Sequence, residues 1–286
     1  MLNCYKDYFI RNGELLPCSK FNTQLFCEGK SIYEVCRVID GIPLFCDEHI
    51  DRLYTSAKMT EVEIRYSREE IIKTIGRLIR ANKVETGNVE IIFNFDDEGG
   101  KDCRVFLALF IENRYPSAEQ YEQGMPSLLM RAERANPNAK QILLELREKT
   151  VEIIREAGIY DVLLVDRNNM ITEGSRSNIF FIQNEKIFTP PLHQVLPGIT
   201  RDKIFQICES PEIPISEKVI YTEDINRFQS AFFTGTSPKI LPLSAVGEVM
   251  FDPQDPLLRY LMKAYNEMIE QNIEKNRDIF SEQKSN

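Results

Sequence analysis

Two β-like runs flank one stretch of small residues around a single carboxylate, Thr172-Glu173-Gly174-Ser175-Arg176-Ser177-Asn178. Glycine and serine let the backbone approach a ligand closely, and the carboxylate of Glu173 can then point at that ligand. A plain acidic turn between two strands has the same composition, so this stretch alone leaves both interpretations open.

Two further segments of small residues offer hydrogen-bond donors suited to an anion. The first, Leu196-Pro197-Gly198-Ile199-Thr200-Arg201, opens an expected helix, whose start exposes backbone N–H groups and the positive end of the helix dipole. The second, Thr234-Gly235-Thr236-Ser237, ends an expected strand. An ordinary helix cap and an ordinary turn have these compositions too.

Arg52 is a fourth feature, within the amphipathic stretch Asp47-Glu48-His49-Ile50-Asp51-Arg52-Leu53. Taken alone, an arginine beside acidic residues on a helix indicates a surface salt bridge. The sequence contains no Walker loop, no Gly-x-Gly-x-x-Gly and no Gly-x-Ser-x-Gly, and their absence argues against three common enzyme classes.

Composition narrows the function classes further. A chain of 286 residues suggests one large domain or two moderate ones. Its formal net charge of −9 argues against a nucleic-acid partner and against binding to an anionic membrane. The sequence shows no apolar run of the roughly 18 residues that a membrane span needs, and no secretory signal at Met1–Asp7. We therefore expect a cytoplasmic protein.

The seven cysteines are scattered, and none forms a Cys-x-x-Cys pair. With only His49 and His193 beside them, we expect no metal site. Free thiols in a reducing cytoplasm are the expected state of these cysteines.

The N-terminal part predicts an α+β arrangement with a largely antiparallel sheet. Residues 1–30 predict irregular structure, whereas Ser31–Phe45 predicts a hairpin, because two β-rich runs flank Asp40-Gly41. Two helices and two strands are expected next: helices from Asp47 and after the cap residue Ser67, and strands at 88–95 and 103–111, joined by a loop at 96–102.

The periodicity lapses between Asn113 and Pro126, which predicts an interdomain connection. Strands and helices alternate beyond it: strands at 128–134, 161–166, 171–172, 178–182 and 230–234, and helices at 141–157, 201–208 and 255–272. The polar tail from Glu274 to Asn286 predicts a frayed end.

Taken in chain order, the four features resemble the class IV aminotransferase family, the fold-type IV enzymes that use pyridoxal 5′-phosphate (PLP). The series that carries this resemblance also includes Tyr33-Glu34, Asp40-Gly41 and Thr189-Pro190-Pro191. The resemblance covers about residues 28 to 247. It implies an α+β, two-domain fold with the cofactor in the cleft between the domains, and a homodimer. The domains would be a smaller N-terminal α/β domain at 1–115, a linker at 116–127, and a larger C-terminal PLP-binding domain at 128–286 with a mixed, β-barrel-like core.

The resemblance also implies the Schiff-base lysine. In the family it lies some thirty residues before the Glu-Gly-Ser motif, at the start of a helix. Lys140 lies 33 residues before Glu173 and precedes the apolar run of the expected helix. The chemistry of the family requires a lysine that loses its proton and condenses with the cofactor aldehyde. The same lysine then moves a proton between the substrate Cα and the cofactor carbon C4′.

Other roles follow from the same resemblance. Glu173 would hydrogen-bond the pyridine nitrogen of the cofactor, and Arg52 would pair with its phosphate. The resemblance further implies that the phosphate is bound by Ile199, Thr200, Gly235 and Thr236. It also implies that Leu196 packs on the cofactor ring and that Tyr33 lines the substrate side.

Two departures bear on the substrate. The strand at 90–96 lacks the Arg-x-His pair with which D-amino-acid aminotransferases hold a carboxylate, and Glu145 stands where branched-chain enzymes usually have a tyrosine. Asn94, Arg134 and Ser237 are the candidates for substrate contact. Arg176 either reaches a substrate carboxylate or faces solvent.

Three functions are compatible with this set of residues. The first is transfer of an amino group from an amino acid to a 2-oxo acid, branched-chain-like rather than of the D-amino-acid type. The second is an aminodeoxychorismate lyase, which needs the same cofactor residues but eliminates pyruvate. The third is a non-catalytic PLP-binding protein, against which the complete cofactor set argues.

Overall fold

A computed structural model describes residues 3–25, 29–95, 103–134, 137–142, 144–209 and 211–281. The chain divides into two compact units. Unit 1 comprises Met1–Asn113, Ala139–Ile142 and Met268–Asn286, and unit 2 comprises Arg114–Asn138 and Leu143–Glu267. Across the described ranges, the helices lack the combination of length and apolar character that would let one cross a membrane.

Unit 1 is built on one antiparallel sheet with the strand order β2-β1-β6-β5-β3-β4. Its strands are β1 (Tyr8–Arg11), β2 (Glu14–Pro17), β3 (Lys30–Ile39), β4 (Ile42–Pro43), β5 (Gly87–Phe95) and β6 (Cys103–Ile111). The predicted hairpin at 31–45 and the two strands after the helices are confirmed. In the long β3–β5 pair, Tyr33 lies opposite Ile92 and Ser31 lies opposite Asn94.

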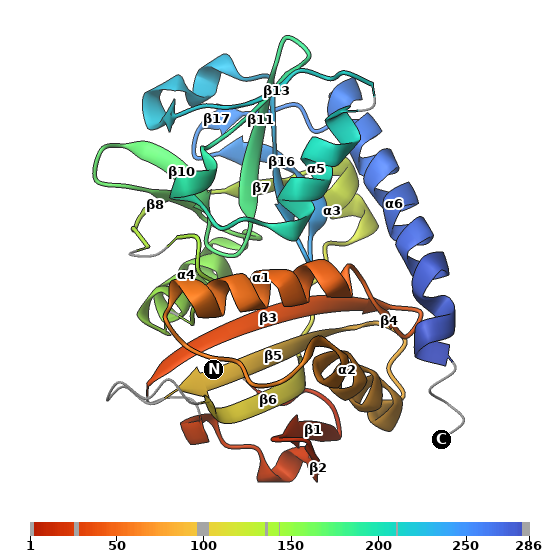
Figure 1. The fold of residues 1–286 in the computed structure, drawn as a ribbon. Helices are drawn as coiled ribbons and strands as arrows, with labels where there is room; N and C mark the ends of the chain where they lie inside the picture. The colour runs from red at the N-terminus through yellow and green to blue at the C-terminus, as the bar shows by residue number, and fades with distance from the viewer. Residues whose placement is uncertain are drawn as a thin grey trace. The chain divides into compact units, whose positions relative to one another are not determined.

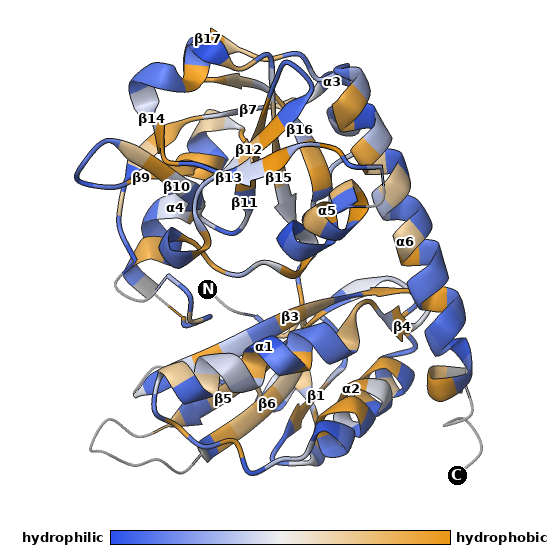
Figure 2. Ribbon diagram, turned by 45° about the horizontal axis from the view of Figure 1, so that its top comes forward, coloured by the Kyte–Doolittle hydropathy of each residue, from blue (hydrophilic) through white to orange (hydrophobic). Residues whose placement is uncertain are grey.

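Helices α1 (Cys46–Met59) and α2 (Arg68–Asn82) share one hydrophobic core with this sheet. Their apolar residues recur at intervals of three and four, as at Ile50, Leu53 and Ala57, so one face of each helix is buried. Ser67 and Glu70 form the capping box that starts α2. Figure 1 shows α1 running along β3, and Figure 2 shows the polar and apolar faces of both helices.

The expectation of irregular structure at 1–30 is wrong for β1 and β2, which form a hairpin followed by short 3-10 turns at Cys18–Lys20 and Thr23–Leu25. The turn places Asn12 (φ 49°) and Gly13 (φ 83°) in the left-handed region, as tight hairpins require. β1 also pairs with the distant strand β6, a contact that no local pattern reports.

The expectation that all cysteines are free is wrong as well, because a disulfide joins Cys4 and Cys18. Cys36, Cys46 and Cys208 are free thiols. Cys27 and the loop at 96–102 lie outside the described residues, and so does the side chain of Cys103.

Unit 2 contains two sheets of mixed direction. One has the order β14-β10-β9-β8, and the other has the order β13-β12-β11-β15-β16-β17, with β7 paired to β16. The strands are β7 (Met125–Ser127), β8 (Leu129–Arg131), β9 (Leu163–Val165), β10 (Met170–Gly174), β11 (Asn178–Gln183), β12 (Lys186–Thr189), β13 (Ile215–Glu217), β14 (Ile220–Tyr221), β15 (Ser230–Gly235), β16 (Lys239–Val246) and β17 (Val249–Met250). The predicted α+β class is confirmed.

The helices of unit 2 are α3 (Ala118–Gln123), α4 (Leu144–Ala157), α5 (Ile199–Glu209) and the first part of α6 (Pro256–Ser281), which belongs to unit 1 from Met268 onward; 3-10 turns lie at Leu192–Gln194 and Thr222–Arg227. Helix α3 and strand β7 lie where the sequence shows no periodicity. At one edge of the unit, β10 ends just after Glu173, β11 begins at Asn178, and Asn178 pairs with Thr234 of β15. Backbone pairing therefore brings two of the small-residue segments together.

Two helix boundaries differ from the prediction. Helix α4 begins at Leu144 rather than at Gln141, because Gln141 instead forms a bridge with Ile32 of β3. Helix α6 runs to Ser281, so the expectation of a frayed tail from Glu274 is wrong over that range. Phe280 is 8% exposed, and its burial anchors the last turn. Residues 282–286 lie outside the described part.

Candidate active site

Lys140 is held by its backbone at the edge of the sheet of unit 1. Its N–H donates to Oγ of Ser56 at 3.1 Å, and its carbonyl accepts the N–H of Tyr33 at 3.1 Å. The bridge between Ile32 and Gln141 places Lys140 opposite Tyr33, so both side chains project from the same face of the sheet. Nζ of Lys140 lies 4.7 Å from the centroid of the Tyr33 ring, which joins two predicted site residues.

Arg52 is held by the buried carboxylate of Glu34, a residue of the Tyr33-Glu34 motif to which the sequence assigned no role. Nε of Arg52 donates to Oε1 of Glu34 at 2.6 Å, and Nη2 donates to Oε2 at 2.8 Å. Nδ1 of His49 lies 2.8 Å from the same Oε2. Glu34 is fully buried and Arg52 is 8% exposed, so Arg52 is not the surface residue that its neighbours suggest.

These three side chains shift one another's proton affinity. Burial alone would raise the pKa of the Glu34 carboxyl, but the charge and hydrogen bonds of Arg52, with those of His49, hold that pKa well below its usual range. Burial lowers the pKa of His49 and outweighs the opposing effect of Glu34. Near pH 7 the group is therefore an anionic Glu34 between a cationic Arg52 and a neutral His49.

Asn94 is fully buried on β5. Its Nδ2 donates to Oγ of Ser31 across the strand pair at 2.9 Å. The amide thus joins two neighbouring strands of unit 1, and its predicted contact with substrate stays a prediction.

In unit 2, the carboxylate of Glu173 is 3% exposed and held from two directions. Oε2 accepts the backbone N–H of Leu196 at 2.9 Å. Oε1 lies 3.2 Å from Nε of Arg134, whose Nη2 donates to the carbonyl of Ser175 at 2.6 Å. A buried carboxylate can accept a hydrogen bond from a protonated ring nitrogen.

Asn178 joins Glu173 to the start of α5. Its Nδ2 donates to the carbonyl of Leu196 at 2.9 Å and lies 3.4 Å from Oε2 of Glu173. A Cβ on Gly198 would lie 2.0 Å from Oδ1 of Asn178, so only glycine fits at that position. In the sequence, Asn178 is only the last residue of the Glu-Gly-Ser motif. Its hydrogen bond to Leu196 joins residues 18 apart and depends on the fold.

The start of α5 carries the predicted residues Ile199 and Thr200, whose backbone N–H groups precede the first intrahelical bond. Oγ1 of Thr200 lies 3.3 Å from the hydroxyl of Tyr265. In β15, the hydroxyl of Thr234 is buried, and no hydrogen-bond partner for it occurs among the described residues. These donors suit an anion.

Gly235, Thr236 and Ser237 follow Thr234 at the end of β15 and are partly buried. A Cβ on Gly235 would come within 3.3 Å of the Pro238 ring and 3.5 Å of the Arg176 carbonyl, so the strand end packs closely against the Glu-Gly-Ser loop. The side chain of Arg176 itself is exposed, as one of its two interpretations required.

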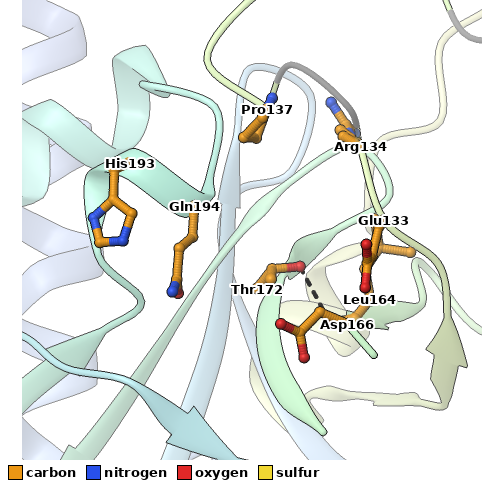
Figure 3. Close-up of a pocket in the computed structure, with 8 residues that line it drawn as sticks. All are labelled: Glu133, Arg134, Pro137, Leu164, Asp166, Thr172, His193 and Gln194. Carbon is orange, nitrogen blue, oxygen red and sulfur yellow. Dashed lines mark hydrogen bonds between the residues drawn. The ribbon is translucent and has the colours of Figure 1, made fainter. Parts of the chain in front are cut away.

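A hollow of about 210 Å³ opens beside this motif in unit 2. Figure 3 shows Arg134 and Thr172 on its wall, with the Thr172 hydroxyl bonded to the carbonyl of Leu164 at 3.3 Å. Arg134 thus lines the hollow and contacts Glu173. The remaining lining residues are Glu133, Pro137, Asp166, His193 and Gln194.

Comparisons with known proteins agree with this arrangement. The family model Amino-transferase class IV matches residues 31–246. The branched-chain-amino-acid aminotransferase of Escherichia coli (strain K12) is 27% identical over 262 residues, which cover 84% of this chain and 85% of that protein. The D-alanine aminotransferase of Bacillus licheniformis is 26% identical over 249 residues, covering 82% and 87%.

Solved structures show the same fold. The crystal structure of the Escherichia coli branched-chain amino acid aminotransferase superposes with a TM-score of 0.81 at 24% identity, covering 92% of this chain and 95% of that one. The family model spans most of the chain, including the lysine segment, the Glu-Gly-Ser loop and the start of α5. On these grounds the protein is an aminotransferase and belongs to the class IV aminotransferase family.

Proposed function

We propose that this aminotransferase uses PLP and transfers the amino group of a branched-chain amino acid to a 2-oxo acid. One observation carries the cofactor assignment: the buried carboxylate of Glu173 is tied, through Leu196 and Asn178, to the start of α5. An acceptor for a protonated ring nitrogen and a seat for a phosphate therefore belong to one rigid part of unit 2.

The donor set fits the cofactor. The phosphate can use the N–H groups of Ile199 and Thr200, the buried hydroxyl of Thr234 and the segment Gly235-Thr236. The guanidinium of Arg52, fixed by Glu34, suits the same dianion. When bound, PLP supplies an aldehyde for an amine and a ring that accepts the electrons of the substrate Cα.

Other residues of the chain have separate roles in the proposed reaction. Lys140 would hold the cofactor through its Nζ and, as a free amine, would be the base that moves the proton of the substrate Cα. Glu173 would hold the proton on the ring nitrogen, and Leu196 would be the apolar neighbour of the ring. The candidates for contact with the substrate are Tyr33 and Asn94 of unit 1 and Arg134 and Ser237 of unit 2.

Two observations favour a branched-chain substrate. Strand β5 is buried along its length and carries no arginine or histidine, so it offers no Arg-x-His pair for the carboxylate of a D-amino acid. The first relatives reported above act, by their names, on branched-chain amino acids. The proposal includes a homodimer and a cytoplasmic location, which ultracentrifugation and cell fractionation test.

The first experiment is the visible absorption spectrum of the purified protein with PLP, before and after L-glutamate is added without any oxo acid. Conversion of the cofactor from its aldehyde to its amine form supports an aminotransferase with a glutamate-type donor. A panel of L-leucine, L-isoleucine, L-valine and D-alanine with 2-oxoglutarate then tests the substrate class. Turnover of D-alanine alone would contradict it.

A lyase of the aminodeoxychorismate type needs the same cofactor residues, and the assay separates the two activities. With aminodeoxychorismate as substrate, a lyase turns over repeatedly without added 2-oxo acid and releases pyruvate. An aminotransferase needs the 2-oxo acid for more than one turnover. Repeated release of pyruvate from aminodeoxychorismate without 2-oxo acid would therefore contradict the proposal.

A further inference from the structure

Asp161, just before β9, has no role in the function described so far. We propose that Asp161 is a positioning residue, which fixes the loop from Gly174 to Ser177 and thereby sets the place of the Glu173 carboxylate. The inference rests on the proposed function of Glu173 as the partner of the cofactor ring.

Asp161 is 1% exposed and acts as the common acceptor of the loop. Its Oδ1 accepts the backbone N–H of Ser175 at 3.1 Å and the hydroxyl of Ser175 at 2.5 Å. Its Oδ2 accepts the N–H of Arg176 at 3.0 Å and the hydroxyl of Ser177 at 2.7 Å. Because two backbone and two side-chain donors of three consecutive residues converge on one carboxylate, the loop closes around it.

The close approach explains the glycine of the motif. A Cβ on Gly174 would lie 2.1 Å from Oγ of Ser177 and 2.6 Å from Oδ2 of Asp161. The N–H of Gly174 also donates to the carbonyl of Ser177 at 2.7 Å, which completes the tight turn. Gly174, Ser175 and Ser177 are therefore the residues that a buried carboxylate at position 161 requires.

The loop that Asp161 closes reaches the rest of the candidate site through its carbonyls. The carbonyl of Ser175 accepts from Arg134, which contacts Glu173. The carbonyl of Arg176 packs against Gly235. At its two ends the loop continues into Glu173 and Asn178. Displacing the loop would thus move the carboxylate, its arginine neighbour and the strand end beside the predicted phosphate seat together.

The test is a double-mutant cycle between Asp161→Asn and Glu173→Gln, measured as kcat and KM with the PLP-loaded enzyme. The asparagine side chain keeps one acceptor oxygen, but its NH2 group cannot accept the two donors that face the other carboxylate oxygen, so the loop must shift. We expect Asp161→Asn to lower kcat about tenfold and to change it less than about twofold when Glu173 is already Gln. The pH profile of the cofactor absorption should shift in Asp161→Asn as well.

Ser177→Ala is the milder variant, since it removes one bond and no charge. It should lower kcat by a few-fold in the same direction. Asp255→Asn is the matched control: Asp255 accepts the N–H groups of Leu257 and Leu258 at the start of α6 and lies outside the candidate site. It should leave kcat and the pH profile unchanged.

The outcomes are distinguishable. Loss of activity in Asp161→Asn that is equal in both backgrounds, with an unshifted pH profile, would overturn the positioning role. Wild-type activity in Glu173→Gln would instead overturn the proposed function of Glu173. If Asp161→Asn does not fold, Ser177→Ala replaces it in the double-mutant cycle with Glu173→Gln. Additive effects of these two substitutions on kcat would then contradict the proposal.

Discussion

Glu34 and Arg52 form a bidentate ion pair in the interior of unit 1, with one guanidinium N–H on each carboxylate oxygen, at 2.6 and 2.8 Å. The pair fixes the plane of the guanidinium before any ligand binds. An arginine held in this way loses little conformational freedom when it binds an anion, which is the physical basis of preorganisation.

Glu34→Gln should weaken PLP binding about tenfold, because the amide cannot accept on both atoms and Arg52 loses its fixed orientation. Titration of the apoenzyme with PLP, followed by absorbance, measures the change. Pyridoxal, which lacks the phosphate, should bind both proteins equally. The control is Arg68→Gln, which breaks an exposed pair with Asp47 and should leave both affinities unchanged.

Stability should fall as the pH drops, in two steps. Burial lowers the pKa of His49, so the unfolded chain binds a proton more readily, and stability is lost as the pH falls below the ordinary histidine value of 6.5. The pKa of Glu34 is held well below the ordinary value of 4.5, so its contribution is present above 4.5 and lost at lower pH. Urea unfolding between pH 7.5 and about pH 2.5 measures both steps. In His49→Gln the upper step should be smaller, and an unchanged upper step would contradict the assignment to His49.

Lys140→Ala should abolish turnover, by at least about a hundredfold, and leave the circular dichroism spectrum unchanged. The side chain lies over a tyrosine at the sheet edge, and only its backbone takes part in the pairing with β3. Lys149→Ala, on the exposed side of α4, is the matched control and should behave as wild type. Wild-type activity in Lys140→Ala would show that another lysine binds the cofactor.

Gly198→Ala should destabilise the protein by about 1–3 kcal/mol and weaken PLP binding, because the new methyl group overlaps Asn178. Gly235→Ala is the graded comparison, since its methyl group would meet the Pro238 ring at 3.3 Å without overlap. Thermal unfolding of both apoenzymes measures the difference. Equal stability of the two variants would show that Asn178 moves aside without cost.

Reduction of the Cys4–Cys18 disulfide should lower the free energy of unfolding by about 3 kcal/mol, the entropic value for a loop of this length. Urea unfolding with and without reductant measures the effect, and Cys4→Ser should reproduce it. Cys208→Ser is the control, because Cys208 is a buried free thiol on α5. If the free energy of unfolding is the same with and without reductant, the disulfide contributes nothing to stability.

The elements that the sequence predicted well are those with local causes. The turn at Asp40-Gly41 and the capping box at Ser67 act within a few residues, and both occur as expected. The β1–β2 hairpin was missed because it has only four residues per strand and is completed by pairing with β6. The end of α6 was missed because its polar surface conceals the buried Phe280.

The same division holds for the site. The family resemblance, rather than a local pattern, pointed to Lys140, whereas the stretches around Glu173 and Thr200 were each open to a plain structural interpretation, and the roles of all three stay predictions. Their supports come from elsewhere in the chain: Glu34 is 18 residues from Arg52, and Asp161 is 14 residues from Ser175. A buried carboxylate shows in the sequence only as one more acid, so the folded pairing was needed to find it.

The pairing of Gln141 with Ile32 constrains how the chain can change in length. Successive residues of a paired segment point to opposite faces, so adding or removing one residue between Ala139 and Ile142 would turn Lys140 away from Tyr33. Helix α4 (Leu144–Ala157) takes no part in this pairing, so the alternation of faces does not extend to it. Among related chains, the number of residues between the lysine and the glutamate should therefore vary more freely than the two-residue step from lysine to Ile142.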